Sequence, residues 1–293
     1  MNTHSRTQKP RTPKTKVAKT YKLFINGEFP RTESGRSFDV LKHKSGEIFA
    51  HLCLASRKDL RNAVTAAQSA QPSWQSRSAY NRGQILYRMA EMAEGKREEF
   101  IEILCETLGL SSSAANQSVS DAIDAFVYFA GFSDKYQQVA GCVNPVSGPH
   151  HNFTTSEPVG VVGLVAAEVM DLSQIAAQLA AIIVSGNAVV ALLGTRGAAL
   201  IAPLAEVFAT SDLPAGVVNL LTGDRNELYK HFGQHMEIHS LSLQDENSKL
   251  LGEFREMAAT NIKRIVPWRK RQLSLEHLLD YVEFKTVWHP AGH

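Results

Sequence analysis

The chain has 293 residues, of which 44% are hydrophobic and 20% are charged, and its formal net charge is +2 at pH 7. These values are ordinary for a soluble globular protein, and the length suffices for one large domain or two small ones. No apolar run is long enough to span a bilayer, and the polar N-terminus argues against a secretory signal. The three cysteines lack the spacing of a metal or redox site, so we expect a cytoplasmic protein with reduced thiols.

Basic side chains are concentrated in residues 1–20, which hold six of the 31 lysine and arginine residues and no acidic residue. The rest of the chain has 25 basic and 29 acidic residues and is therefore mildly acidic. This composition predicts a disordered basic tail over residues 1–20. Such tails can bind nucleic acid or an acidic partner. Because this one shows neither aromatic interleaving nor clustering, we expect a solvated extension and no nucleic-acid partner.

The region from residue 22 to residue 138 has the pattern of a hairpin followed by helices. Asn26-Gly27 is a strong two-residue hairpin signal, because both residues tolerate positive φ. Ser56 and Asp59 nearly match a capping box at the start of a helix. The predicted elements are short strands near residues 36–41 and 48–54 and helices at residues 56–70, 78–95, 97–108 and 119–138.

An apolar strand–helix–strand unit spans residues 157–195. Residues 159–166 and 188–193 are continuous apolar runs, which are typical of strands buried on both faces of a parallel sheet. Residues 173–184 repeat apolar side chains at helical spacing, and Ser185-Gly186-Asn187 ends that helix. The unit is a βαβ motif, whose first strand-to-helix turn binds nucleotides in many folds.

Strand and helix patterns continue to alternate around this unit, which predicts an α/β fold with a doubly wound parallel sheet. Val282 to Trp288 alternates at period two and predicts a terminal strand with Phe284 and Trp288 on one face. The other predicted elements are a loop with an edge strand at residues 141–156, a helix at 195–210, strands at 217–222 and 239–243, a short helix at 227–232, and polar amphipathic helices at 250–261 and 270–281.

Five of these stretches resemble the aldehyde dehydrogenase superfamily. They are FINGEF at residues 24–29, EPVGVVG at 157–163, SGNAVV at 185–190, DLPAGVVNLLTGD at 212–224 and FKTVW at 284–288. The resemblance covers about residues 21–244 and 281–292. It implies the family's Rossmann-like cofactor domain, with a small β oligomerisation module from the N-terminal hairpin and the C-terminal strand. The chain most resembles the shortened, inactive C-terminal half of two-domain family members.

This resemblance divides the chain into four parts. Residues 1–20 are the tail, and residues 21–244 are a cofactor-type domain. Residues 245–281 are a helical linker in place of the catalytic domain. Residues 282–293 are the oligomerisation strand and the C-terminus.

The family's chemistry needs residue types that this chain lacks at the matching positions. The family oxidises aldehydes through a cysteine thiolate, an oxyanion-binding asparagine, a nicotinamide cofactor and a glutamate that activates water. Val169 stands at the position of the asparagine, and Leu192 and Thr195 stand where a lysine and a glutamate bind the cofactor's ribose. Leu243 replaces the glycine of the phosphate-binding turn. The resemblance therefore predicts no catalytic residue and a vestigial NAD site that binds no cofactor.

The cysteines and histidines supply no substitute. Cys105 lies on an apolar helical face and is expected to be inert, while Cys53 and Cys142 have no histidine placed to activate them. Three histidines spaced by four residues would share a helix face, as in a metal site, but Gly233 and the strand predicted after it favour exposed histidines without a metal. They are His231, His235 and His239; His150 and His151, in a loop, are also expected at the surface.

Two functions from different classes remain open. The first is a pseudoenzyme, a non-catalytic aldehyde-dehydrogenase-like protein that acts as a structural or regulatory partner of a complete aldehyde dehydrogenase. It would form a homo-oligomer, or a hetero-oligomer with that enzyme, through Phe284, Val287 and Trp288. The alternative is an NAD(P)-dependent oxidoreductase acting on the aldehyde or oxo group of donors, or a nucleotide binder that retains the fold. Neither function calls for a membrane.

Overall fold

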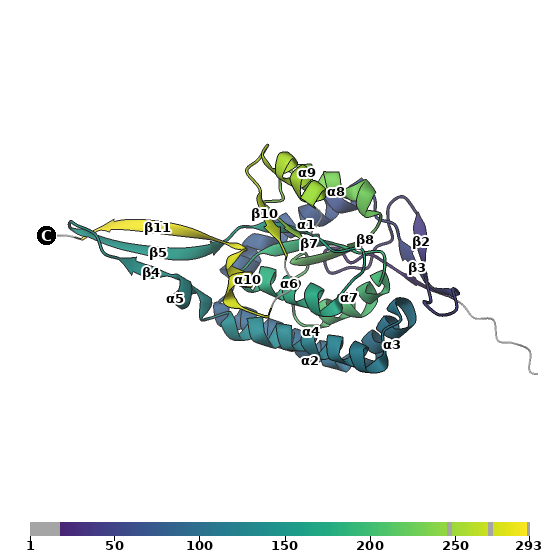
Figure 1. Ribbon diagram of the computed structural model, residues 1–293. Coiled ribbons are helices and arrows are strands. Elements are labelled where there is room, and N and C mark those ends of the chain that lie inside the picture. The colour runs from purple at the N-terminus through teal and green to yellow at the C-terminus, as the bar shows by residue number, and fades with distance from the viewer. Residues whose placement is uncertain (1–17, 245–247, 269–271, 292–293) are drawn as a thin grey trace, which may run out of the picture.

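The structure, a computed structural model, describes residues 18–244, 248–268 and 272–291. The chain forms an α/β body with a narrow β arm at one end and a small three-stranded sheet at the other (Figure 1). In the part of the chain that the structure describes, no helix is long and apolar enough to cross a membrane.

Five parallel strands form the sheet at the centre of the body, in the order β10-β9-β6-β7-β8. Their bounds are β6 Val161–Val165, β7 Ala188–Leu193, β8 Val218–Thr222, β9 Ser240–Leu243 and β10 Arg264–Pro267. The chain passes from the central β6 to β7 and β8 on one side and then crosses to β9 and β10 on the other. This is the doubly wound α/β topology that the sequence predicts.

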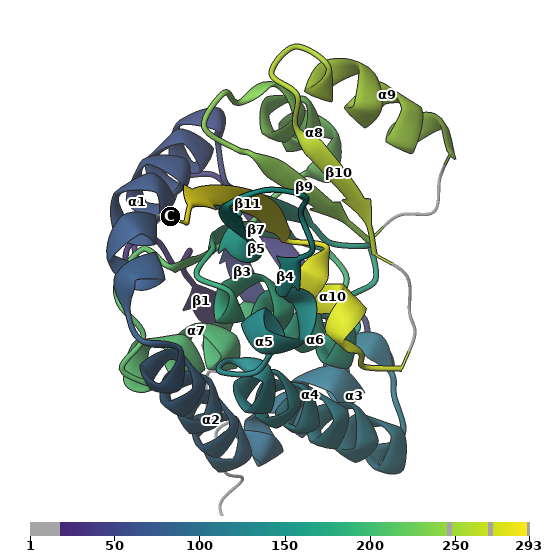
Figure 2. The same ribbon diagram turned by 90° about the vertical axis from the view of Figure 1, so that its left-hand side faces the viewer.

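Helices cover both faces of this sheet (Figure 2). On one face lie α1, α8 and α9. On the other lie α6 and α7, beneath an outer layer of α2 and α4. The helix bounds are α1 Arg57–Ser76, α2 Ala79–Gly95, α3 Arg97–Leu108, α4 Ser112–Phe132, α5 Tyr136–Ala140, α6 Leu172–Val184, the 3-10 turn Ala198–Leu200, α7 Ile201–Thr210, α8 Arg225–Gln234, α9 Ser248–Ala258 and α10 Leu275–Leu279. Every residue of β6 to β9 is buried between these layers.

Local sequence signals explain where several elements begin and turn. Ser56 Oγ accepts the backbone N–H of Asp59, and the Asp59 carboxylate accepts the backbone N–H of Ser56 at 2.7 Å, so the capping box of α1 is present. Asn26 and Gly27 have φ values of 55° and 74°, as a type I′ hairpin turn requires. The residues before this turn bridge to β8, which places the hairpin against the body.

The small sheet corrects the predicted extent of the basic tail. It consists of β1 (Lys19–Tyr21), β3 (Ile48–Cys53) and β2 (Ser37–Leu41), in the order β1-β3-β2. Residues 19 and 20 were predicted to be disordered, but they pair in parallel with β3. The reason is that the half-buried Tyr21 packs against the hydrophobic core and anchors the strand. Residues 1–17 of the predicted tail lie outside the described residues.

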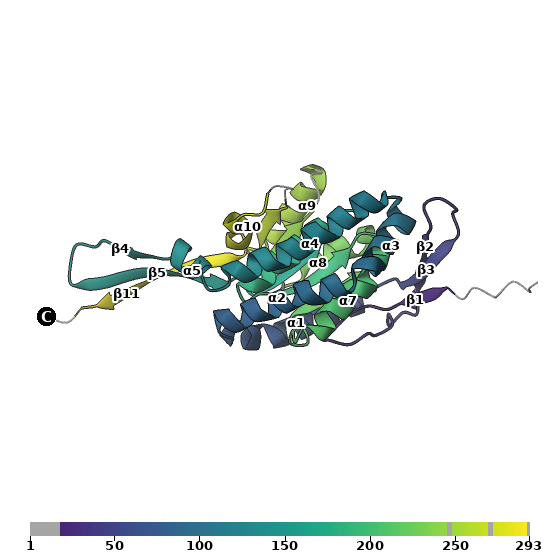
Figure 3. The ribbon, with the colours of Figure 1, turned by 90° about the horizontal axis from the view of Figure 1, so that it is seen from below.

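The arm is an antiparallel sheet in the order β11-β5-β4 that projects from the body (Figures 1 and 3). Its strands are β4 (Cys142–Asn144), β5 (His150–Pro158) and β11 (Val282–Pro290). The stretch predicted as a loop with an edge strand therefore forms two strands, and the predicted terminal strand is present. Polar residues hide the strand pattern because the arm lies away from the apolar core: Asn144 Nδ2 donates to Asn152 Oδ1 at 2.5 Å and to Thr154 Oγ1 at 2.9 Å.

Strand β10 corrects the prediction of helices alone between residues 245 and 281. It pairs with β9 through the backbone N–H groups of Arg264 and Trp268, and its two consecutive β-branched residues favour a strand. The Arg264 guanidinium donates to the carbonyl oxygens of Asp280 and Val282, at 3.2 and 2.6 Å. These bonds tie the edge of the body's sheet to the base of the arm.

One buried amide joins three parts of the chain. Asn187, between α6 and β7, is fully buried, and its Oδ1 accepts the backbone N–H of Gly160 at 2.8 Å. Its Nδ2 donates to Ile182 O at 3.0 Å, to Ser185 Oγ at 2.8 Å and to Tyr281 O at 2.9 Å. The side chain thus links the end of α6, the start of β6 and the residue that precedes β11.

The replacement Asn187→Ala is expected to lower the free energy of unfolding by about 2–4 kcal/mol, because each buried polar group left unsatisfied costs about 1–3 kcal/mol. Urea denaturation followed by circular dichroism measures the loss. The control is Asn226→Ala, which truncates an exposed asparagine and should change stability by less than about 0.5 kcal/mol. Equal effects of the two replacements would contradict the role given to Asn187.

Candidate functional site

Doubly wound sheets bind ligands beyond the carboxyl ends of the strands, at the point where the chain reverses its direction across the sheet. Here that point lies between Val165, the end of β6, and Leu243, the end of β9, and we call it the switch-point crevice. The side chain of Gln244 spans it. Its Oε1 accepts the backbone N–H of Ala167 at 3.2 Å, and its Nε2 donates to Gln178 Oε1 at 2.6 Å.

A buried hydrogen-bond chain holds Gln244 in this position. Gln178, in the middle of α6, is fully buried and donates to the hydroxyl of Ser242 on β9. Ser242 shares a further hydrogen bond, of 2.5 Å, with the hydroxyl of Tyr281, which is also fully buried. The chain of bonds therefore runs from the base of the arm to the switch-point crevice. Networks of this kind fix side-chain positions, because breaking one bond leaves buried polar groups unpaired.

The loops that follow β6 and β7 meet backbone to backbone. A Cβ atom at Gly194 would lie 1.9 Å from the carbonyl oxygen of Ala167, so only glycine permits this approach. The backbone N–H of Arg196 donates to Glu168 O at 3.0 Å. In addition, the Thr195 hydroxyl donates to the Glu168 carboxylate. The space between these two strand ends is closed by the chain itself.

In doubly wound folds that bind phosphate, the N-terminus of the helix after the first strand points at the phosphate. In this chain that helix is α6, and its N-terminus already has an anionic partner. The Asp171 carboxylate accepts the backbone N–H groups of Ser173 and Gln174, at 3.0 and 3.3 Å, and the Ser173 hydroxyl at 2.6 Å. Free N–H groups at a helix N-terminus attract phosphate. A carboxylate in their place repels it.

The structure places the four sequence-predicted site residues in two groups. Val169 is 46% exposed, forms a bridge with Arg196, and so lies at the same edge as Thr195. Leu192 and Leu243 are each 1% exposed and belong to the core between the sheet and α1. The structure thus brings Val169 and Thr195 together, and it places Leu192 and Leu243 inside the fold.

Sequence reasoning missed the three polar residues that shape the crevice, Gln178, Gln244 and Asp171. Two signals were available. Gln178 interrupts an otherwise apolar helix, LSQIAAQLAAIIV, which marks a buried polar group that needs partners. Asp171 directly precedes the same helix, where aspartate is a preferred N-cap.

A polar cavity of about 450 Å³ lies beside the closed crevice, beyond the ends of β7 and β8. Glu168, Thr195 and Arg225 are among the residues that line it. Two further lining residues are bonded to each other: the Tyr229 hydroxyl donates to Glu253 at 2.9 Å, and this hydrogen bond raises the pKa of Tyr229. The cavity offers charged side chains of both signs.

As predicted, the three histidines spaced by four residues do not share one helix. His239 is exposed as expected, but His231 and His235 are half-buried. His231 lies in α8, His235 follows that helix, and His239 precedes β9, where its Nδ1 accepts the backbone N–H of Val161 at 3.1 Å. Burial, together with the charge of Lys263, lowers the pKa of His235. Within residues 18–244, 248–268 and 272–291, no group of three metal-binding side chains is present.

The three thiols are dispersed. Cys53 is buried, Cys105 is half-buried, and Cys142 is exposed on β4. The Cys142 thiol donates to Asn144 Oδ1 at 2.9 Å. In their described surroundings, none of these thiols has a hydrogen bond to a histidine or a carboxylate.

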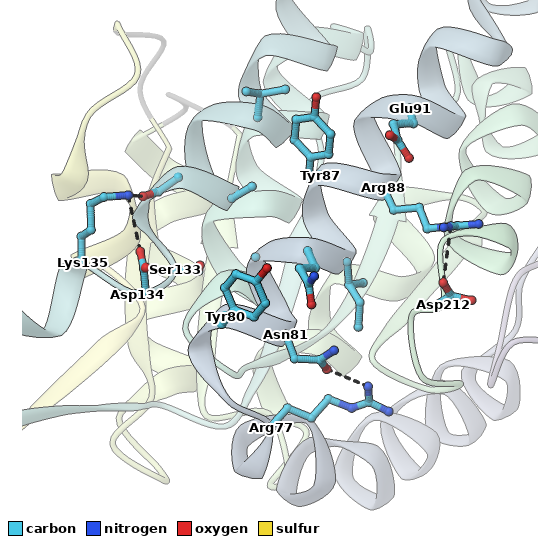
Figure 4. Close-up of a pocket in the computed structure, with 16 residues that line it drawn as sticks. Arg77, Tyr80, Asn81, Tyr87, Arg88, Glu91, Ser133, Asp134, Lys135 and Asp212 are labelled. Atoms are coloured by element: carbon cyan, nitrogen blue, oxygen red, sulfur yellow. Dashed lines mark hydrogen bonds and ion pairs between the residues drawn. The ribbon is translucent and has the colours of Figure 1, made fainter.

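A larger groove of about 700 Å³ lies between α2 and α4, away from the strand ends (Figure 4). Two of its arginines have local partners: Arg77 donates to Asn81 Oδ1 at 2.9 Å, and Arg88 forms an ion pair with Asp212 at 3.4 Å. Neither a histidine nor a cysteine lines it. The groove therefore offers neither a thiol nor an imidazole for catalysis.

The arm exposes large apolar side chains. Phe284, Val287 and Trp288 are 52%, 41% and 60% exposed. Phe284 and Trp288 lie on one face of β11, and Val287 lies on the other, because strand residues alternate. Both faces of the arm therefore offer apolar surface to a partner.

Comparison with known proteins gives consistent matches. A model of the aldehyde dehydrogenase family matches residues 29–266. The cytosolic 10-formyltetrahydrofolate dehydrogenase of Xenopus laevis is 30% identical over 257 residues, which are 84% of this chain and 28% of that protein. The mitochondrial benzaldehyde dehydrogenase of Antirrhinum majus is 28% identical over 249 residues, which are 83% of this chain and 46% of that protein.

Among solved structures, the NAD+ complex of an aldehyde dehydrogenase from Bacillus cereus is similar, with a TM-score of 0.77 and 26% identity. The match covers 84% of this chain and 50% of that one. A dehydrogenase from Sinorhizobium meliloti has a TM-score of 0.80 at 22% identity, which shows the shared fold. The chain thus spans about half the length of these structures, and less than half of the curated relatives named above.

The replacement Gln244→Leu is expected to lower the free energy of unfolding by about 1–3 kcal/mol. It leaves the backbone N–H of Ala167 and the side-chain amide oxygen of Gln178 without a hydrogen-bond partner. The double replacement Gln178→Leu with Gln244→Leu should cost less than the sum of the two single ones, since contacting residues couple by about 0.5–3 kcal/mol. Urea denaturation of the four proteins gives this coupling. Additive losses would show that the two amides act independently.

Proposed function

Because this chain belongs to the aldehyde dehydrogenase family, we propose that it is a pseudoenzyme of that family, a non-catalytic partner of a complete aldehyde dehydrogenase. It binds this partner through the arm. The observation that carries the proposal is the combination of an intact, exposed arm with a switch-point crevice occupied by the chain's own Gln244. The arm, which is the proposed assembly surface, is exposed, and the crevice in which a cofactor would bind is filled by Gln244.

The residues at the crevice do not fit a dinucleotide. The pyrophosphate of a bound dinucleotide would need the space that Gln244 spans. It would also meet the carboxylate of Asp171 at the N-terminus of α6. Val169 can donate no hydrogen bond to an oxyanion. Opening the crevice would also break the buried bonds of Gln178, at a cost of about 1–3 kcal/mol for each group left unpaired.

The arm has the properties of a strand-pairing interface. Within the described residues, β11 pairs with β5 alone, so its other edge presents unpaired backbone groups. Extended strands add to such edges through main-chain hydrogen bonds, while neighbouring side chains supply specificity. Phe284 and Trp288 are large aromatic residues of the kind that carry binding energy at interfaces.

Co-expression with a complete aldehyde dehydrogenase, chosen from those whose genes lie beside this one, is expected to give a stable complex in size-exclusion chromatography with light scattering. Phe284→Arg or Trp288→Ala should weaken that complex by at least about tenfold, because truncated interface anchors cost about 2 kcal/mol or more. Tyr80→Arg is the control, since it changes an aromatic residue that is 67% exposed outside the arm. A complex that survives both arm replacements, or no complex at all, would refute the proposal.

The alternative function, nucleotide binding with or without oxidoreductase activity, has one observation in its favour: the polar cavity of about 450 Å³ beyond β7 and β8. The pseudoenzyme proposal predicts no saturable heat when NAD+, NADH, NADP+ or NADPH is titrated into the chain, which means a Kd weaker than about 1 mM. Micromolar binding would favour the alternative. Aldehyde-dependent reduction of NAD+ or NADP+, followed by absorbance, would establish an enzyme.

A further inference from the structure

Two histidines face each other across the outer end of the arm. His151 on β5 and His289 on β11 are directly paired in the antiparallel register. Side chains opposite each other in such a pair have Cβ atoms about 4.5–5.5 Å apart and point to the same face. Both histidines are exposed. Their imidazoles are therefore close enough to bind one ligand between them.

The surroundings on this face contain few competing charges. Further from the tip, on the same face, lie Lys285 and Glu157, which form an ion pair with each other, and Glu283, which is paired in register with Glu157. Next to the histidines the face is apolar: the rings of His151 and Phe153 lie 5.4 Å apart, and Val287 is paired with Phe153. An apolar surround strengthens metal binding and is itself stabilised when a partner covers it.

Neutral imidazole is the commonest protein ligand for zinc and related transition metals. Zinc sites that hold protein together are almost always tetrahedral, with four ligands. One arm supplies two, and the described residues hold no group of three metal-binding side chains that could complete a site within one chain. A second arm, related by a twofold axis, supplies the other two, because such an axis brings the same surface of each copy together.

We propose that two copies of this chain join arm tip to arm tip around one transition-metal ion, such as Zn²⁺, bound by His151 and His289 of each copy. The arm projects clear of the body, so two tips can approach without collision between the bodies (Figures 1 and 3). The contact also covers the apolar side chains beside the histidines, including Val287 and the 69% exposed Val143. This assembly involves the chain alone and does not depend on the proposed complex with an aldehyde dehydrogenase.

The test uses the full chain, produced without a histidine tag and freed of metal with a chelator. Zinc chloride is titrated in by calorimetry, and the mass is followed by sedimentation velocity. We expect one zinc ion per two chains and a zinc-dependent doubling of mass that the chelator reverses. His151→Gln and His289→Gln should each weaken zinc binding by at least about tenfold and abolish the doubling, because each removes two of the four ligands of the shared site.

The matched control is His43→Gln, which replaces an exposed histidine in the small-sheet region and should leave zinc binding and mass unchanged. Circular dichroism checks that each variant remains folded. Three results would overturn the proposal: one zinc ion per chain without a change of mass, zinc binding that both arm replacements leave intact, or no zinc binding. Since no aldehyde dehydrogenase is present, such results would leave the proposed hetero-oligomer standing.

Discussion

The fold depends on the hydrogen bonds of one buried amide, that of Asn187. Its oxygen and nitrogen satisfy backbone groups at the end of α6, the start of β6 and the residue before β11. These three places are far apart in the sequence, and they meet where the arm leaves the body. Because the two bonds donated to Ile182 and Tyr281 are buried and the one from Gly160 is partly buried, directed hydrogen bonds as well as apolar contacts hold the arm's position relative to the sheet. The orientation of the arm is therefore fixed by buried groups of the body.

Buried hydrogen bonds also close the switch-point crevice. Tyr281, which offers its carbonyl oxygen to Asn187, uses its hydroxyl to bind Ser242, and the bonds continue through Gln178 to Gln244. One polar network thus serves both the base of the arm and the strand ends. The scaffold of the family is retained where it builds the sheet. At the switch-point crevice, the chain's own side chains satisfy each other's hydrogen bonds.

Continuous apolar runs, the Asn-Gly turn and the capping box were enough to predict the alternation of strands and helices in the doubly wound body, because these signals are local. Strand β10 and most of β5 were not predicted, since both are short or polar and are stabilised by strands distant in sequence. The site was predicted only in part. Val169 and Thr195 could be placed at the strand ends by counting along the chain, whereas the partners of Gln178 and Gln244 become evident only when α6 and β9 are packed together.

The edge of the body's sheet differs from the edge of the arm. In β10, Arg264 and Trp268 turn their N–H groups toward β9, so alternation turns Ile265 and Pro267 outward. Proline has no N–H group, which leaves this short edge a poor template for another strand. An open parallel sheet would otherwise invite uncontrolled aggregation. The consequence is a difference between the two edges: β11 leaves backbone groups open to strand pairing, whereas the β10 edge is protected against self-templating.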